Sequence, residues 1–175
     1  MSSFRPNRRL FLLSLAALAG CGFTPAFGPS GSANALMGTI SIDDPRNLDD
    51  FNFVAQMEQR LGVASAPRFQ LSYSIATKEE IVGLTPKQEI IRRQVVGDLS
   101  YTVRDVAAGR ILTSGKLDNF TGYSVGVLDL TATPPQTSST ISTLSAQRDA
   151  SERLMVALAD QLVTRLIATA ETWAQ

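Results

Sequence analysis

The chain has 175 residues, with 16 lysines and arginines against 16 aspartates and glutamates, no histidine and one cysteine. The lack of histidine excludes a catalytic triad or metal site built on imidazole, and a lone cysteine excludes a disulfide within the chain. The equal numbers of basic and acidic residues argue against general nucleic-acid binding, which needs a strong basic excess.

The first 20 residues have the composition of a bacterial export signal. Arg5, Arg8 and Arg9 form a basic start, and the apolar run at 10–19 is too short to cross a bilayer about 30 Å thick. Leu18-Ala19-Gly20-Cys21 resembles the lipobox of bacterial lipoproteins, in which the chain is cut before an acylated cysteine. We therefore expect a lipoprotein signal peptide at 1–20 and lipid attachment at Cys21. Because Arg8-Arg9 also resembles a twin-arginine signal, the choice between Sec and twin-arginine export stays open.

The segment after the cysteine is predicted to be a tether. Residues 21–35 are rich in Gly, Pro and Ser, a composition typical of flexible linkers. Gly22 stands where an Asp commonly retains lipoproteins at the inner membrane, so this resemblance favours the periplasmic side of the outer membrane. The 155 residues left after cleavage suit a single domain at 36–175, with 13 basic against 16 acidic residues and a net charge of −3.

A short strand at 36–42 and an amphipathic helix at 48–61 are predicted to open this domain. Asn47 is the expected N-cap, two aspartates complement the helix dipole in the first turn, and Gly62 is the expected residue after the helix. Helical spacing predicts a buried stripe that faces the core rather than a membrane, and this stripe comprises Leu48, Phe51, Val54, Ala55 and Leu61, with Glu58 off the pattern.

Alternating apolar and polar residues predict three further strands, at 68–77, 89–106 and 110–123. The turn between the last two falls at 107–109. A connection that holds only a short strand is predicted at 78–87. Gly97 is predicted to mark a β-bulge.

A polar stretch with two prolines predicts a loop at 126–140. A long helix is predicted from Ile141 or Ser142 to Trp173, because apolar residues recur every three or four positions, at Met155, Leu158, Leu162, Leu166 and Ala170. The predicted fold class is α+β, with two helices packed on one face of a roughly four-stranded, mostly antiparallel or mixed sheet.

Catalytic and cofactor motifs are missing from the sequence. It has no phosphate-binding glycine motif, and the Ser- and Thr-rich stretch at 137–145 has no base near it in sequence. The acidic pairs lie where solvated loops and helix caps are expected, at Asp43-Asp44, Asp49-Asp50 and Glu79-Glu80. We therefore expect no enzyme, no cofactor and no metal site.

Basic residues are concentrated between positions 92 and 116. Five basic side chains stand there against Asp98 and Asp105, a net charge of +3, and they are Arg92, Arg93, Arg104, Arg110 and Lys116. Arginine and lysine are the side chains that hold phosphates. The alternative is that these side chains only keep exposed strands polar and so prevent edge pairing.

Three short sequences resemble sequences of the LPS-assembly lipoprotein LptE family. The order of the predicted helices and strands also resembles that family over nearly the whole chain. The three sequences are Cys21-Gly22-Phe23-Thr24-Pro25, Arg-Gln-Val-Val-Gly-Asp-Leu-Ser-Tyr at 93–101 and Ala-Asp-Gln-Leu at 159–162. The resemblance implies a two-helix, four-stranded domain that plugs the outer-membrane barrel LptD, helps it assemble and assists lipopolysaccharide transport. It also implies lipopolysaccharide contact by basic side chains, for which the candidates are Arg92, Arg93, Arg110 and Lys116.

The partners implied are thus an LptD-like barrel, lipopolysaccharide and, through the lipid anchor, the membrane, with no nucleic acid. The long polar connection at 131–140 departs from the family pattern and leaves the loop geometry open. Two other classes fit the same tether and domain: an auxiliary lipoprotein of another envelope lipid transporter, and a lipoprotein activator of a cell-wall enzyme.

Overall fold

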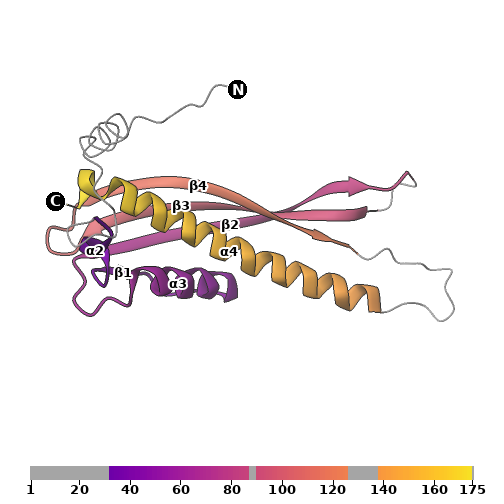
Figure 1. Cartoon of the computed structure of the whole chain (residues 1–175), viewed down its shortest axis with the longest axis horizontal. Helices are drawn as coiled ribbons and strands as arrows, with labels where there is room; N and C mark the ends of the chain where they lie inside the picture. Colours follow the sequence, from indigo (N-terminus) through magenta and orange to yellow (C-terminus); the bar gives the residue numbers. More distant parts are fainter. Residues whose placement is uncertain (1–31, 87–89, 126–137, 175) are drawn as a thin grey trace, which may run out of the picture.

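The computed structural model describes residues 32–86, 90–125 and 138–174, drawn in colour in Figure 1. Along the described chain the elements are α2 (Ser32–Leu36), β1 (Ile40–Ile42), α3 (Leu48–Leu61), β2 (Phe69–Leu84), β3 (Ile90–Asp105), β4 (Ile111–Ser124) and α4 (Ser138–Trp173). The predicted signal peptide, Cys21 and most of the predicted loop at 126–140 lie outside the described residues.

The strands form one mixed sheet in the order β1-β2-β3-β4. β1 pairs in parallel with the start of β2, whereas β2 with β3 and β3 with β4 are antiparallel. β2 and β3 have 16 residues each, and at about 3.3 Å per residue such a strand is roughly 50 Å long. The sheet therefore sets the long axis of the molecule (Figure 1).

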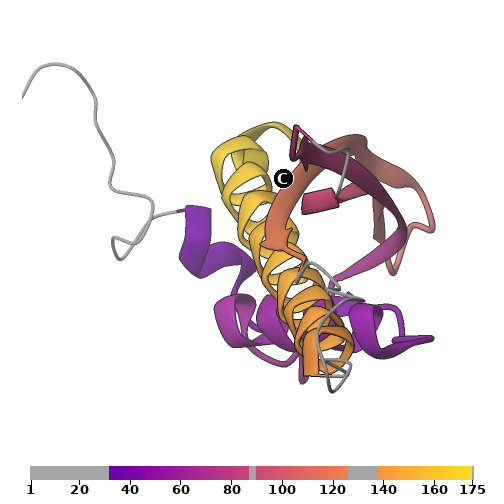
Figure 2. The same cartoon turned by 90° about the vertical axis from the view of Figure 1, so that its right-hand side faces the viewer.

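Both long helices cover the same face of the sheet. Figure 2, a view along the long axis, shows α4 against the curved sheet with α3 beside it. Fully buried side chains from the sheet and from both helices meet between these layers, among them Leu71, Leu99, Val103, Phe53, Met57, Leu158 and Leu162. This arrangement confirms the predicted α+β fold class.

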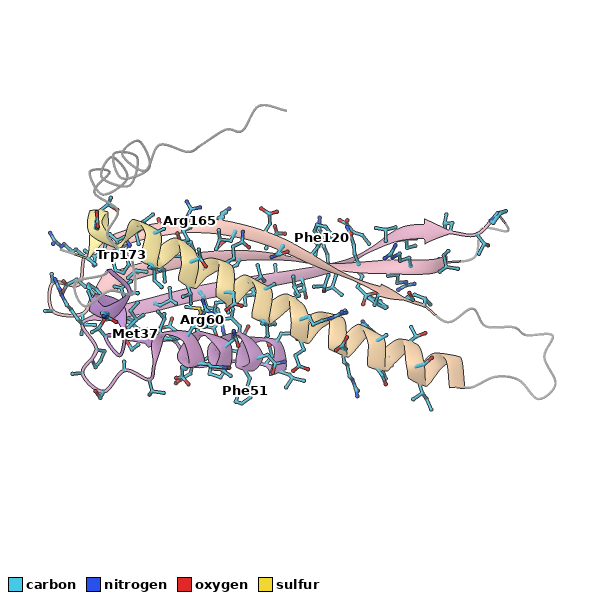
Figure 3. All side chains as sticks on the ribbon, in the orientation of Figure 1. Met37, Phe51, Arg60, Phe120, Arg165 and Trp173 are labelled. Atoms are coloured by element: carbon cyan, nitrogen blue, oxygen red, sulfur yellow. The ribbon has the colours of Figure 1, made fainter. Side chains whose placement is uncertain are left out.

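Helix α3 confirms the predicted ends and only part of the predicted buried stripe, because Val54 and Leu61 are buried but Leu48, Phe51 and Ala55 are exposed. The Asn47 side chain accepts a hydrogen bond from the Asp50 backbone N–H at 2.8 Å, and Gly62 follows the helix with φ of 77°. The helix buries Phe53 and Met57 instead of the predicted Leu48 and Phe51, which are 70% and 57% exposed. Figure 3 shows Phe51 pointing away from the sheet.

The strand predicted at 36–42 is confirmed only at Ile40–Ile42, and Leu36 is helical. Leu36 ends α2, β1 begins only at Ile40, and the helix buries Ala33 and Leu36 completely. Gly38 takes φ of 67°, a conformation that favours glycine and ends the helix. Packed structure therefore includes residues 33–35, inside the stretch predicted as tether.

Strand β2 continues through residues 78–84, where the sequence predicted a connection. Cross-strand side-chain contacts favour this extension: Arg93 Nη1 lies 3.0 Å from Glu79 Oε2, and Gln94 Nε2 lies 2.9 Å from Glu80 Oε2. The pairing shifts register on both sides of Gly83, where a Cβ would stand 2.9 Å from the Cβ of Arg92. An irregularity thus falls at Gly83.

Gly97, by contrast, pairs in regular register with both neighbouring strands, so the predicted bulge there is wrong. The residue lies under α4, where a Cβ would stand 3.0 Å from Leu158 Cδ1 and 3.1 Å from Leu154 Cδ2. A glycine at this position lets the helix approach the sheet closely.

Helix α4 begins at Ser138, a few residues before the predicted start, and ends at the predicted Trp173. The predicted apolar stripe is confirmed, since Met155, Leu158, Leu162 and Leu166 are fully buried. Among the described helices, none combines the length and the apolar character that a membrane span needs.

Candidate functional site

The acidic pairs that the sequence singled out take part in hydrogen bonds between elements. Asp49 Oδ1 accepts from Ser151 Oγ at 2.8 Å, which ties α3 to α4, and Asp43 Oδ1 accepts from Gln70 Nε2 at 2.9 Å. Within the described residues, no group of three or more acidic or cysteine side chains is placed to hold a metal ion. A structural role accounts for these carboxylates.

Asp50 and Tyr73 form a buried polar spot under the start of α3. The Asp50 carboxylate is buried, accepts from the Arg46 backbone N–H at 3.2 Å and lies 3.7 Å from Arg46 Nε. The Tyr73 hydroxyl is also buried and has no hydrogen-bond partner in the described part of the chain. Burial, and after it the charge of Asp50, raises the pKa of Tyr73 to about 12. Tyr73 therefore stays protonated at neutral pH and is no general base.

Arg92 and Arg93 point to opposite faces of β3, as successive strand residues must. Arg92 is exposed on the outer face. Arg93 turns toward the helix side, where it pairs with Glu79 at 3.0 Å and keeps 36% of its side chain exposed. Arg93 is therefore already engaged by a carboxylate, whereas Arg92 is open to solvent.

Arg110 and Lys116 lie far from that pair. Arg110 stands in the exposed β3–β4 turn, where its carbonyl accepts from the Asp105 backbone N–H at 3.0 Å, and Lys116 is exposed opposite Ser100. Ser100 is eight residues from Arg92 along β3, and the β3–β4 turn is more than twelve residues away, so the separations are roughly 26 and 40 Å. The four candidate phosphate-binding residues do not converge on one pocket.

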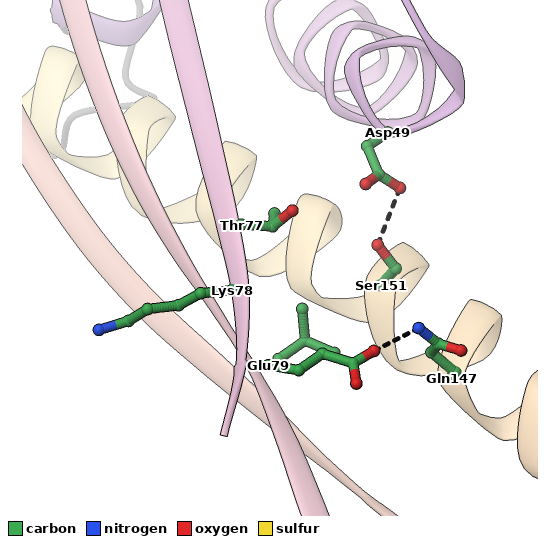
Figure 4. Close-up of a pocket in the computed structure, with 7 residues that line it drawn as sticks. Asp49, Thr77, Lys78, Glu79, Gln147 and Ser151 are labelled. Carbon is green, nitrogen blue, oxygen red and sulfur yellow. Dashed lines mark hydrogen bonds between the residues drawn. The ribbon is translucent and has the colours of Figure 1, made fainter. Parts of the chain in front are cut away.

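A hollow of about 170 Å³ lies between β2, the start of α3 and α4. Figure 4 shows the Glu79 carboxylate bonded to the Gln147 amide across it, and the Lys78 side chain pointing away. Cavities that hold organic ligands usually measure about 300–1,000 Å³. This hollow is too small for such a ligand, and two pairs of its polar groups join α4 to β2 and to α3.

The outer face of the sheet is not covered by any described element and is mainly polar. The Lys78 ammonium and the Glu80 carboxylate form an ion pair there at 3.0 Å, and their hydrogen bond raises the pKa of Lys78 and lowers the pKa of Glu80. Phe120 stands out on this face with 62% of its surface exposed (Figure 3). Serine and threonine account for much of the remainder, at Ser72, Ser74, Ser100 and Thr102.

Sequence reasoning missed a group of exposed apolar side chains at one end of the long axis. We call this the distal end; its exposed apolar residues come from the tips of β2 and β3 and from the first turns of α4, and they are Ile81, Val82, Leu84, Ile91, Ile141 and Leu144. The β2–β3 hairpin extends beyond α3 along the long axis, so no described element covers these exposed side chains (Figure 1).

Comparison with known proteins finds bacterial lipoproteins among the solved structures that have a similar fold. No protein-family model matches the chain, and no curated protein sequence matches it. A candidate lipoprotein from Caulobacter crescentus CB15 has a TM-score of 0.59 at 16% identity, over 80% of this chain and 95% of that one.

Two further solved structures are similar. Rare lipoprotein B from Shewanella oneidensis has a TM-score of 0.53 at 10% identity, over 76% of this chain and 94% of that chain. A minor lipoprotein from Acinetobacter baumannii has a TM-score of 0.52 at 16% identity, over 77% and 92%. At these identities the likeness establishes a shared fold: this chain is folded like these lipoproteins.

Proposed function

We propose that this protein is an outer-membrane lipoprotein that partners an LptD-like barrel in lipopolysaccharide assembly. One observation carries the proposal: a chain with a lipobox at Cys21 has a fold that matches lipoproteins over more than nine-tenths of their length. Binding rather than catalysis agrees with the structural bonds that engage the carboxylates of Asp43, Asp49 and Glu79.

The shape and polarity of the sheet suit a plug. The lumen of an outer-membrane barrel is polar, and the outer face of this sheet presents hydroxyl-bearing side chains such as Ser72, Ser74 and Ser100. A strand length of roughly 50 Å exceeds the apolar height of a bilayer, about 30 Å. The domain is thus long enough to extend through a barrel lumen.

Lipopolysaccharide contact by basic residues is part of the same proposal. Arg92 and Lys116 share the outer face of the sheet, and Arg110 lies at the β3–β4 turn; all three are exposed. Arg93 is the weakest of the four candidates, because it would have to leave Glu79 before it could bind a phosphate. Contact would therefore be distributed along the sheet.

Co-purification tests the proposal. The full-length protein with a C-terminal tag is extracted from envelope membranes in mild detergent, and a large outer-membrane barrel should be recovered with it. An inner-membrane lipid transporter in its place would favour the auxiliary-lipoprotein function, and a wall synthase would favour the activator function. Either result would overturn partnership with an LptD-like barrel.

The anchor is tested by Cys21→Ser. We expect this variant to escape acylation and lipoprotein processing, and to leave the outer-membrane fraction. Metabolic labelling with a fatty acid and membrane fractionation provide the measurement. Normal acylation and outer-membrane location of the variant would contradict the lipoprotein assignment.

A further inference from the structure

One end of the long axis combines exposed apolar and basic side chains, and we call it the anchor end. Its apolar members are Met37, Val63 and Val106, which are 43%, 71% and 52% exposed, and its exposed basic members are Arg68, Arg104 and Arg110.

Hydrogen bonds between three separate loops bring these residues together. The Gly38 N–H, next to Met37, donates to Leu61 O at 2.7 Å near Val63, and the Val106 N–H donates to Arg68 O at 3.0 Å. Arg104 pairs in register with Ile111 directly after the turn that holds Arg110. The α2–β1, α3–β2 and β3–β4 connections thus form one surface.

Among the residues of these three connections and the end of β3, positive charge exceeds negative charge, with Arg68, Arg104 and Arg110 against Asp105. The Asp105 carboxylate is turned back into its own loop, where it accepts from the Ala108 N–H at 2.8 Å. The Arg68 guanidinium lies 4.9 Å from the centre of the Phe69 ring, with its side chain exposed. Exposed apolar side chains beside basic ones are the composition that binds the interface of a membrane containing anionic lipids.

The position of the predicted lipid anchor supplies the second argument. Ten residues separate Cys21 from Ser32, where α2 begins. Ten residues span at most about 36 Å even when fully extended. The distal end lies roughly 50 Å farther along the strands, so acylation at Cys21 holds the anchor end, and not the distal end, near the bilayer.

We propose that the anchor end rests on the lipid headgroups of the membrane that holds the acyl chains. Arg68, Arg104 and Arg110 then bind anionic headgroups, while Met37, Val63 and Val106 enter the interfacial layer. The long axis stands away from the membrane and presents the distal end to a partner. This inference depends on the lipid anchor of the proposed function, and it concerns the lipoprotein before it joins a partner.

Site-specific fluorescence tests this proposal on the full acylated protein. Its single cysteine carries the lipid, so a polarity-sensitive dye can be attached at a new cysteine, either Val106→Cys at the anchor end or Val82→Cys at the distal end. The two positions are matched in exposure, at 52% and 49%. The protein is reconstituted into vesicles of phosphatidylethanolamine and phosphatidylglycerol that contain a nitroxide lipid as quencher.

We expect strong quenching of the dye at position 106 and none at position 82. Replacing Arg68, Arg104 and Arg110 together with Gln should abolish the quenching at 106. Replacing three exposed basic residues elsewhere, Arg92, Lys116 and Arg148, should leave it unchanged. Equal quenching at the two positions, no quenching at 106, or equal effects of the two triple variants would overturn the proposal.

Flotation of the vesicles separates this inference from the proposed function. Protein that fails to float with the vesicles is not acylated, and the lipoprotein assignment then fails. Protein that floats but shows no quenching at position 106 is anchored without resting on the surface, and only the inference of this subsection fails.

Discussion

Gly97 determines how closely α4 packs on the sheet. A methyl group at this position would stand 3.0 Å from Leu158 Cδ1 and 3.1 Å from Leu154 Cδ2, both on buried side chains. We expect Gly97→Ala to lower the free energy of unfolding by about 1–3 kcal/mol, the usual cost of overpacking a core. Urea unfolding of the mature chain carrying Cys21→Ser measures this change.

Gly122→Ala is the control for this prediction. A Cβ at Gly122 on β4 would find only Arg93 O within 4 Å, at an ordinary distance of 3.7 Å. Its stability should therefore stay within about 0.5 kcal/mol of the parent. Equal losses for the two variants would show that glycine is needed for the strands themselves and not for the approach of α4.

The buried hydroxyl of Tyr73 predicts a loss of stability in alkali. Its pKa is raised from 10.0 to about 12 in the folded chain. The folded state therefore keeps a proton that the unfolded state releases, and the free energy of unfolding falls as the pH rises from 10 towards 12. In Tyr73→Phe this fall should be smaller by about 2 kcal/mol, as measured by urea unfolding across this pH range.

At neutral pH the same variant should be as stable as the parent or slightly more stable, because it removes a buried hydroxyl without a partner in the described structure. A large loss of stability at neutral pH would mean that the hydroxyl makes a hydrogen bond, for instance to a buried water molecule.

At the scale of whole elements, α3 offers a matched pair of phenylalanines. Phe53 is fully buried, with its ring centre 4.9 Å from that of Tyr73, whereas Phe51 is 57% exposed. We expect Phe53→Ala to cost about 3–5 kcal/mol and Phe51→Ala less than about 0.5 kcal/mol. Thermal or urea unfolding of both variants measures these losses. The reverse order would mean that Phe51 faces the core, as the sequence predicted.

Local patterns made most elements predictable, while the choice between faces depended on tertiary contacts. The ends of α3 follow from Asn47 and Gly62, which act on their own backbone neighbours. Two phenylalanines two residues apart fall on nearly opposite sides of a helix, so the pattern alone could not decide which of Phe51 and Phe53 meets the sheet. Contact with Tyr73, on a strand that follows later, makes that choice.

The candidate site was harder to predict than the fold for a similar reason. A net positive charge along 92–116 is visible in sequence, but the alternation of β3 sends Arg92 and Arg93 to opposite faces. The turn at 107–109 then carries Arg110 to the far end of the sheet, away from both. An extended strand such as β3 separates residues that are close in sequence by tens of ångströms.

For the molecule as a whole, this spacing predicts additive effects on lipopolysaccharide binding. Replacing Arg92, Arg110 and Lys116 singly with Gln should each weaken binding by about 1.5–3 kcal/mol where the residue holds a phosphate. Groups more than about 10 Å apart act independently, so the triple variant should show the sum of the single losses. Binding is measured at low ionic strength with the unacylated Cys21→Ser protein.

Arg93→Gln is the internal comparison, since Glu79 already holds Arg93; its effect on binding should be smaller. The competing interpretation is that the basic residues only prevent edge pairing. On that view the triple variant binds lipopolysaccharide as its parent does but aggregates more readily. Light scattering of the same samples measures this aggregation. The fold and the melting temperature should be little changed in all five variants.

The edge contact between the rings of Phe69 and Trp173, whose centres lie 5.2 Å apart, also bears on the order of events during folding. β2 begins with Phe69, and the helix that covers the apolar face of the sheet is the last described element to be synthesised. A nascent chain therefore cannot close its core until the segment up to Trp173 has left the ribosome. Contacts between residues so distant in sequence form slowly, so the core of the described domain closes after its synthesis and not during it.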